Sequence, residues 1–199
     1  MQHHPHAASE IMRILALLAL LLVQPALGED YLIDPAHTSV DFEITALGLF
    51  DQHGRFDRVR GALTLDETRR GEMHIEIDAD SIDTGLDLRD RDYRSARWFD
   101  TARYPTLIFH SRRFVFEGDR LVAIEGELTL RGITRSLRFS VERFQCGLLP
   151  GSGRIGCSAT ATATLKRSNY GMDTYSLLVG DEVKLHIEVE MLRAAAERE

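Results

Sequence analysis

An alternation of apolar and polar residues with a period of two constrains this 199-residue chain more than any other feature. Val40, Phe42 and Ile44, for example, are separated by acidic residues. Such alternation is typical of β-strands that have one face on a core and the other in water. The segments that show it, or fit between its turns, are 40–46, 54–66, 73–78, 107–110, 120–131, 135–145, 159–165 and 183–190. We therefore predict one all-β domain of about eight antiparallel strands, folded as a sandwich or a closed barrel.

One strand has unusually small side chains on its predicted inner face. Ala159, Ala161 and Ala163 alternate with three threonines. A row of methyl groups packs poorly in a filled core, but it leaves room in a barrel that holds a ligand. Bulky residues of neighbouring strands could equally fill that space, so the pattern alone leaves both interpretations open.

The alternation fails between Leu86 and Thr101, where charged residues are mixed with aromatic ones. A short helix fits this segment better than a strand. The residues predicted to share one side of the helix are Leu88, Arg91 or Asp92, and Ser95. We expect the charged residues to face water and Trp98 and Phe99, at the end of the helix, to turn inward. A helical excursion between strands would then form a cap over one end of a barrel.

The first residues predict export. Arg13 is followed by the apolar run ILALLALLLV and then by small residues that end at Gly28. This is the pattern of a secretory signal peptide, and the run is shorter than the roughly 20 residues of a membrane-spanning helix. We predict a signal peptide over residues 1–28, cleavage after Gly28, and a periplasmic or secreted domain over residues 29–199. A retained N-terminal anchor is the alternative.

The net charge of the chain is −7. It stays −7 after the predicted cleavage, because the removed segment carries one acidic residue, Glu10, and one basic residue, Arg13. An acidic chain without a basic stripe is a poor candidate for binding nucleic acid. We predict no nucleic-acid partner.

The two cysteines, Cys146 and Cys157, lie in the stretch CGLLPGSGRIGC. The residues between them, with Pro150 and three glycines or serines after it, predict a turn that brings two strands side by side. In an oxidising compartment we expect a structural disulfide across this hairpin. A free thiol pair and a catalytic thiol are the alternatives.

No residue pattern indicates catalysis or a metal site. His74, His110 and His186 lie at predicted outward strand positions, without the spacing of metal ligands. The sequence shows no arrangement of a Ser-His-Asp triad, no phosphate-binding loop and no Cys-His pair that would indicate an enzyme. We therefore predict no catalytic residue, no metal and no cofactor.

Six stretches of the chain carry recognisable motifs in a fixed order. They are YLIDPAHTSVDFEI (31–44), SIDT (81–84), RDRDYRSARWFDTARYPTLIFHS (89–111), GELTLRGITRSL (126–137), KRSNYGM (166–172) and VGDEVKLHIEVE (179–190). Together they resemble the YceI-like proteins, a family of polyisoprenoid-binding, lipocalin-like exported proteins. None is a catalytic fingerprint alone, but six in order over nearly the whole predicted mature chain are specific.

The resemblance implies an eight-stranded, lipocalin-like barrel with a short helical cap between strands. It also implies that the apolar interior holds a long isoprenoid chain, such as a polyprenyl phosphate or a quinone precursor. Each CH₂ group removed from water contributes about 0.8 kcal/mol, so such a chain needs a carrier in an aqueous compartment. The chain departs from the family pattern at Ala46, where a histidine is common, and at Asn169 and Tyr170, which replace Asp and Phe.

The predicted site has an apolar and a polar part. Residues expected to contact the ligand's hydrocarbon chain are Phe42, Ile44, Ala46, Ile75, Ile77, Trp98, Phe99, Phe109, Leu128 and Ala161. Residues expected to contact its head group are His37, Arg89, Asp90, Arg94 and Arg167. Arginine suits a phosphate because its planar fork can bind two oxygens at once. His37 could instead hold the N-terminal segment in place, and the charges of the cap could form a surface salt-bridge network.

The interpretation favoured by these features is an exported, non-enzymatic protein that binds an isoprenoid lipid or a quinone-like molecule. One alternative is an enzyme or enzyme accessory that acts on such a substrate. Another is a stress-induced or structural protein whose barrel is filled by its own side chains. Transient contact with a membrane or membrane proteins, and a homodimer, are compatible with the first interpretation.

Overall fold

The computed structural model describes residues 29–66 and 68–195. The predicted signal peptide and its cleavage site lie outside these residues, so both stay predictions. The strands are β1 (Glu29–Ile33), β2 (Ser39–Ala46), β3 (Phe50–Phe56), β4 (Val59–Leu65), β5 (Gly71–Asp78), β6 (Ile82–Asp83), β7 (Thr106–Glu117), β8 (Arg120–Leu130), β9 (Ile133–Leu148), β10 (Ile155–Lys166) and β11 (Val179–Arg193). The helices are η1 (Pro35–His37), η2 (Ala79–Ser81), α2 (Asp87–Arg94) and η3 (Arg167–Tyr170).

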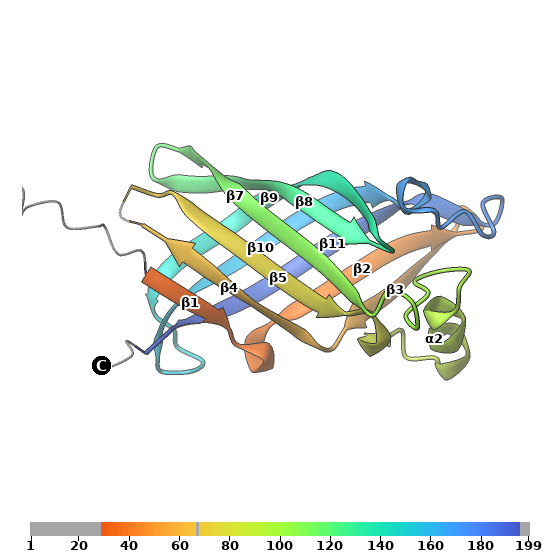
Figure 1. Cartoon of the computed structure of the whole chain (residues 1–199), viewed down its shortest axis with the longest axis horizontal. Coiled ribbons are helices and arrows are strands. Elements are labelled where there is room, and N and C mark those ends of the chain that lie inside the picture. Colours follow the sequence, from red (N-terminus) through yellow and green to blue (C-terminus); the bar gives the residue numbers. More distant parts are fainter. Residues whose placement is uncertain (1–28, 67, 196–199) are drawn as a thin grey trace, which may run out of the picture.

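Within the described residues, eight strands close into an antiparallel barrel (Figure 1). They follow the order β1-β4-β5-β7-β8-β9-β10-β11, and pairing of β11 with β1 closes the ring. The long strand β11 pairs with β2 along its first part and with β1 at its end. Strand β3 pairs with β2, and the short β6 adds to β3. The predicted closed barrel of eight antiparallel strands is confirmed.

Two of the long strands are interrupted, and one interruption corrects the prediction of a continuous strand over 54–66. At Asp57 and Arg58 the chain leaves the sheet between β3 and β4. There the amide of Asp57 donates to the Ser81 carbonyl (3.2 Å) and that of Arg58 to the Ser81 hydroxyl (3.1 Å). The other break is η1, where the Asp34 side chain accepts a hydrogen bond from the Ala36 amide.

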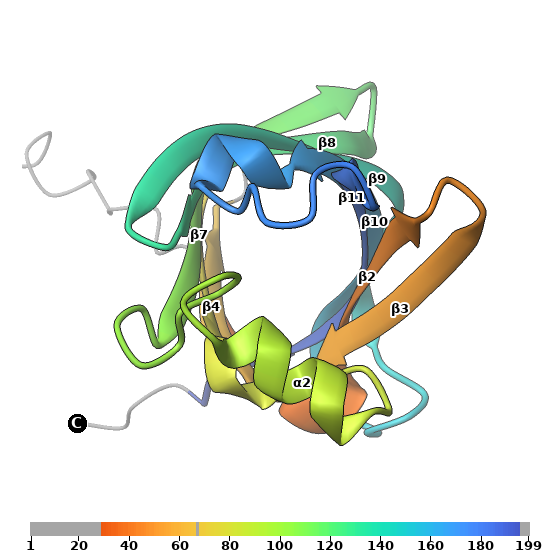
Figure 2. The same cartoon turned by 90° about the vertical axis from the view of Figure 1, so that its right-hand side faces the viewer.

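The two ends of the barrel differ. One end carries the β2–β3 turn, the excursion between β5 and β7, and the segment 167–178, and we call it the mouth end (Figure 2). The excursion over residues 84–105, which contains α2, is called the lid segment. The other end, the far end, carries the turns that follow β4, β7 and β9. No helix within the described ranges is long and apolar enough to cross a bilayer.

The far end holds the predicted disulfide. Cys146 of β9 lies opposite Cys157 of β10 and the two are bonded. The intervening turn is closed by a hydrogen bond from the Leu149 amide to the Arg154 carbonyl (2.8 Å). The prediction of a bridged hairpin is confirmed.

Candidate ligand-binding site

An apolar cavity runs along the inside of the barrel. Its volume is about 140 Å³. An apolar cavity of about 150 Å³ can stay dry and bind small apolar molecules. The lining residues are Ile33, Thr38, Val40, Phe42, Ile44, Phe56, Val59, Met73, Ile75, Ile77, Tyr93, Trp98, Phe99, Leu107, Phe109, Ile124, Leu128, Leu130, Leu137, Phe139, Ala159, Ala161, Leu165, Arg167, Met172, Val183, Leu185, Ile187 and Val189.

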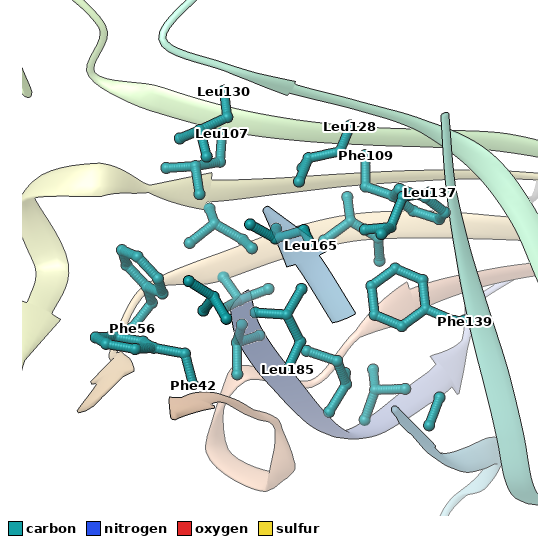
Figure 3. A pocket seen from close by; sticks show the side chains of 18 of the residues that line it. Phe42, Phe56, Leu107, Phe109, Leu128, Leu130, Leu137, Phe139, Leu165 and Leu185 are labelled. Carbon is teal, nitrogen blue, oxygen red and sulfur yellow. The ribbon is translucent and has the colours of Figure 1, made fainter. Parts of the chain in front are cut away.

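Small side chains on β10 keep the cavity open. Ala159 and Ala161 both line it, and bulky neighbours do not fill the space that they leave. Figure 3 shows side chains of facing strands, among them Phe109, Leu137 and Leu185, directed at this common space. The cavity favours a barrel that holds a ligand over one that is filled by its own side chains.

Aromatic rings form the wall of the cavity at the mouth end. The Phe42 ring lies 5.8 Å from that of Phe56 and 6.3 Å from that of Tyr93, measured between centroids. Phe99 meets Phe56 edge to face at 5.5 Å. Gly54 is the cross-strand partner of Phe42, and a Cβ atom there would collide with the Phe42 ring. Glycine at this position therefore lets the ring lie flat against β3.

The helix of the lid segment is shorter than expected. Helix α2 ends at Arg94, whereas the prediction placed Trp98 and Phe99 at its end. Leu88 is 77% exposed, and Asp90 and Tyr93 are the buried residues of the helix. Acidic residues in its first turn and basic ones in its last complement the helix dipole.

Asp90 is an exception to the expectation that the charges of the lid segment face water. Its carboxylate accepts hydrogen bonds from the amide of Thr84 (2.9 Å) and from the Thr84 hydroxyl. These bonds compensate its burial and fix the chain where it enters α2. Asp90 does not line the cavity.

Two of the three arginines predicted to contact a head group, Arg89 and Arg94, fasten the lid segment to the barrel. Arg89 donates to the Gln52 side chain on β3 and to the Thr84 carbonyl (2.6 Å). Arg94 donates to the carbonyls of Asp80 (2.9 Å) and Ile82 (2.7 Å). Neither lines the cavity, so a head-group role for them stays a prediction.

Trp98 closes the cavity from the lid segment. It is only 5% exposed, and its indole N–H donates to Oδ2 of Asp92 (3.0 Å). The Tyr93 ring lies 4.8 Å from it, and burial raises the pKa of the Tyr93 hydroxyl. The half-buried Phe99 lines the cavity beside it. The inward orientation of both predicted aromatics is confirmed.

Arg167 is the one predicted head-group residue that lines the cavity. Its side chain is buried, and four of the five N–H donors of a guanidinium are bound to backbone carbonyls of the segment before and at the start of β11. The acceptors are Met172, Thr174, Val179 and Gly180. Burial lowers the pKa of this guanidinium. Because all four partners are uncharged, the wall of the lumen carries a cation without a bonded anion.

His37 lies away from the lumen. Its side chain is 42% exposed, and Nδ1 is 3.0 Å from Oδ2 of Asp34 and 4.0 Å from Oε2 of Glu190. The hydrogen bond to Asp34 raises the pKa of His37 and lowers that of Asp34. The geometry fits the structural role considered for His37, and its neighbour Thr38 lines the cavity instead. Glu190 is far from Asp34 and His37 in the sequence, so residue spacing could not predict that its carboxylate lies beside them.

The remaining predicted positions lie either in the cavity lining or outside it. Every predicted apolar contact lines the cavity except Ala46, which lies at the end of β2 opposite Phe50. Asn169 is exposed and Tyr170 is buried outside the lining, so these departures from the family pattern do not alter the cavity wall. The predicted outward positions of His74, His110 and His186 are confirmed, since none lines the cavity.

Sequence reasoning missed several lining residues. Phe139 and Leu165 share the inner parity of their strands, so the period-two pattern could have found them. Tyr93 and Met172 lie outside strands, where no periodicity indicates which side chains turn inward. Thr38 follows η1 and carries no pattern of its own.

The structure defines a class of protein, a closed antiparallel barrel that can enclose a small apolar molecule. Its features are an apolar cavity, a lid segment at one end and a buried cation in the cavity wall. The model of the YceI-like domain matches residues 31–191. The chain belongs to the YceI-like family.

Relatives and solved structures agree with this assignment. A UPF0312 protein of Vibrio cholerae is 30% identical over 164 residues, which cover 80% of this chain and 86% of the relative. BcnA of Burkholderia cenocepacia superposes with a TM-score of 0.67 at 21% identity, covering 79% of this chain and 98% of BcnA. A polyisoprenoid-binding domain from Saccharophagus degradans, implicated in plant cell wall breakdown, has a TM-score of 0.61 at 18% identity. It covers 84% of this chain and 99% of that domain.

Proposed function

We propose that this protein is an exported, non-enzymatic carrier that holds a long isoprenoid lipid, such as a polyprenyl phosphate or a quinone precursor, in its barrel. The observation that carries the proposal is the apolar lumen, which is lined along its length by aliphatic and aromatic side chains. Each CH₂ of a prenyl chain moved from water into such a lumen contributes about 0.8 kcal/mol. The polyisoprenoid-binding domain among the solved structures supports the same chemistry.

The polar end of the ligand would lie near Arg167. This guanidinium is the only charged group in the cavity lining of the described chain, and one of its five N–H donors has no partner among the carbonyls that it binds. A buried cation favours an anionic or strongly accepting group beside it. We therefore infer a ligand with its phosphate or quinone oxygen at Arg167 and its prenyl chain toward the far end.

The direct test is native mass spectrometry of the protein purified from its own host, followed by organic extraction. A bound species of isoprenoid mass is the expected result. Ala161→Phe places a ring in the lumen and should lower the bound fraction, whereas Thr164→Phe, on the outer face of the same strand, should not. An extract without isoprenoid, or equal retention by both variants, would reject the proposal. Turnover of the extracted lipid by the purified protein would favour the enzymatic alternative.

The exported location is a separate part of the proposal. It is supported by the signal-peptide pattern that ends at Gly28. N-terminal sequencing of the protein isolated from the periplasm or medium should start at Glu29. A mature protein that keeps Met1 or Met12 would contradict it.

A further inference from the structure

Exposed apolar side chains are concentrated at the mouth end of the barrel. Of the eleven large hydrophobic residues that are exposed in the described chain, eight lie there and three lie on the other half. The eight are Leu47, Leu49 and Phe50 of the β2–β3 turn, Tyr175, Leu177 and Leu178 before β11, and Leu86 and Leu88 at the start of α2. We call this set the apolar crown. Exposed apolar patches of this kind mark interaction surfaces.

The crown is held together by the backbone. The Leu47 amide donates to the Leu178 carbonyl (2.6 Å), which ties the β2–β3 turn to the segment before β11. Within that segment the Leu178 amide donates to the Tyr175 carbonyl (2.8 Å). Figure 1 shows both turns at the same end of the barrel as α2. Six of the eight crown residues therefore lie on two turns that a backbone hydrogen bond joins.

The crown is continuous with the wall of the cavity. The Tyr175 ring, 46% exposed, lies 6.4 Å from the ring of Trp98, which lines the lumen. Leu86 and Leu88 begin the helix whose buried Tyr93 lines the lumen beside Trp98. The crown therefore borders the part of the cavity wall that Trp98 and Tyr93 form.

The shape and charge of the crown favour a lipid bilayer as its partner. Leu49 and Leu177 are 80% and 97% exposed on two separate turns. A protein partner would need a matching pocket for each projecting side chain, whereas the acyl region of a bilayer accepts them in any arrangement. Exposed charged residues of both signs lie beside the crown: Asp51 and Asp87 next to it in sequence, Arg91 one turn along α2 from Leu88, and Arg97, whose carbonyl accepts a hydrogen bond from Thr174. Because neither sign surrounds the crown alone, a zwitterionic surface suits it.

We propose that the apolar crown seats the mouth of the barrel on a zwitterionic phospholipid bilayer, with Leu49 and Leu177 inserted among the acyl chains. In this orientation the mouth end faces the membrane, and an isoprenoid lipid moves between the lumen and the bilayer without crossing water. The transfer step rests on the proposed function, but the membrane contact itself does not.

The test is flotation of the purified protein with phosphatidylcholine vesicles that contain no isoprenoid. The double variant Leu49→Ser with Leu177→Ser should reduce the bound fraction by about 10-fold or more, because each leucine loses the transfer of its side chain out of water. The matched control is Leu148→Ser with Ile155→Ser at the far end, where the same kind of residue is 68% and 49% exposed. This control should bind like the wild type, and raising the salt concentration should change little.

Three results would overturn the proposal: no vesicle binding by the wild type, an equal loss in the far-end control, or a dimer that only the crown variant dissociates. The last would make the crown an interface between two copies, and sedimentation velocity detects it. Ala161→Phe separates this proposal from the carrier function, since it should impair lipid retention and leave vesicle binding intact. Circular dichroism of each variant establishes that the barrel is folded.

Discussion

The guanidinium carbon of Arg167 lies 5.1 Å from the centre of the Trp98 ring. This contact joins the segment before β11 to the lid segment across the mouth of the cavity. Cation–π contacts of this geometry contribute up to about 2 kcal/mol where water is excluded. The same arginine therefore holds a loop, supports the lid segment and places a positive charge in the lumen.

Substitution of Arg167 separates these roles. Arg167→Met leaves buried carbonyls without a donor, and the free energy of unfolding should fall by about 2–4 kcal/mol, since each unpaired group costs about 1–3 kcal/mol and some will reach water. Arg167→Lys keeps the charge but not the planar fork. We expect both variants to lower the urea midpoint, and only Arg167→Met to lose a preference for polyprenyl phosphate over the corresponding alcohol. An unchanged preference in both would remove Arg167 from the head-group site.

Trp98→Ala should loosen the lid segment more than the barrel. Truncation of a buried tryptophan costs about 3–5 kcal/mol where the site cannot collapse. Because Trp98 belongs to the lid segment, part of this cost should appear as faster release of bound isoprenoid, while the β-sheet signal in circular dichroism persists. Leu88→Ala, at an exposed position of the same segment, is the control. Loss of the β-sheet signal in Trp98→Ala would show that the residue is part of the core of the fold.

Reduction of the disulfide should destabilise the far end without opening the lumen. Closing a loop of this length contributes about 2–3 kcal/mol, which corresponds to a melting temperature about 5–10 °C lower in a domain of this size. Scanning calorimetry of the double variant Cys146→Ser with Cys157→Ser measures the effect. Thiol labelling of the unfolded, unreduced wild type should give no signal. Two labelled thiols, or an unchanged melting temperature of the variant, would contradict a stabilising role of the disulfide.

The Asp34–His37 pair predicts a pH-dependent contribution to stability. Because the pKa of His37 is raised, its contribution to stability is complete when the pH is below 6.5, the ordinary pKa of histidine. This contribution is lost as the pH rises through the raised pKa. The lowered pKa of Asp34 means that its contribution is complete above the ordinary value of 3.8 and is lost as the pH falls through the lowered value. The pair is therefore strongest between about pH 4 and 6.5.

Asp34→Asn should destabilise the protein most within that window and progressively less above it. Melting temperatures measured from pH 4 to 9 would show this dependence, and NMR titration should give a lower pKa for His37 in the variant. Asp51→Asn is the control, because that carboxylate accepts a hydrogen bond from a threonine and not from a histidine. Equal pH profiles of the wild type and Asp34→Asn would refute the coupling.

The inner faces of the strands could be predicted from the sequence, and the polar contacts of the lid segment could not. Period-two alternation decides which of two faces a residue such as Phe109 occupies, and closure of the barrel then directs that face inward. Ala46 follows the same parity, yet it lies beyond the lumen because the cavity ends before β2 does. The period-two pattern predicts which face of the sheet a side chain lies on, but not how far along the barrel the cavity extends.

The lid segment shows a different limit. In a helix of eight residues, Leu88 and Asp90 compete for the buried side, and the apolar residue would win on hydrophobicity alone. The hydrogen bonds from Thr84 reverse this outcome, and they depend on a loop conformation that no pattern encodes. Arg89 and Arg94 look like anion ligands in the sequence, but they donate to Gln52 of β3, to the Thr84 carbonyl and to the Ile82 carbonyl.

The inward side chains of β11 face a space that the chain itself does not occupy. Val183, Leu185 and Ile187 are only half-buried although they point into the barrel. A guest that covers them adds to the stability of the folded state in proportion to the logarithm of its concentration. Cells remove marginally stable proteins that unfold more often. The lifetime of this protein would then follow the supply of its guest, so that its abundance reports how much lipid there is to carry.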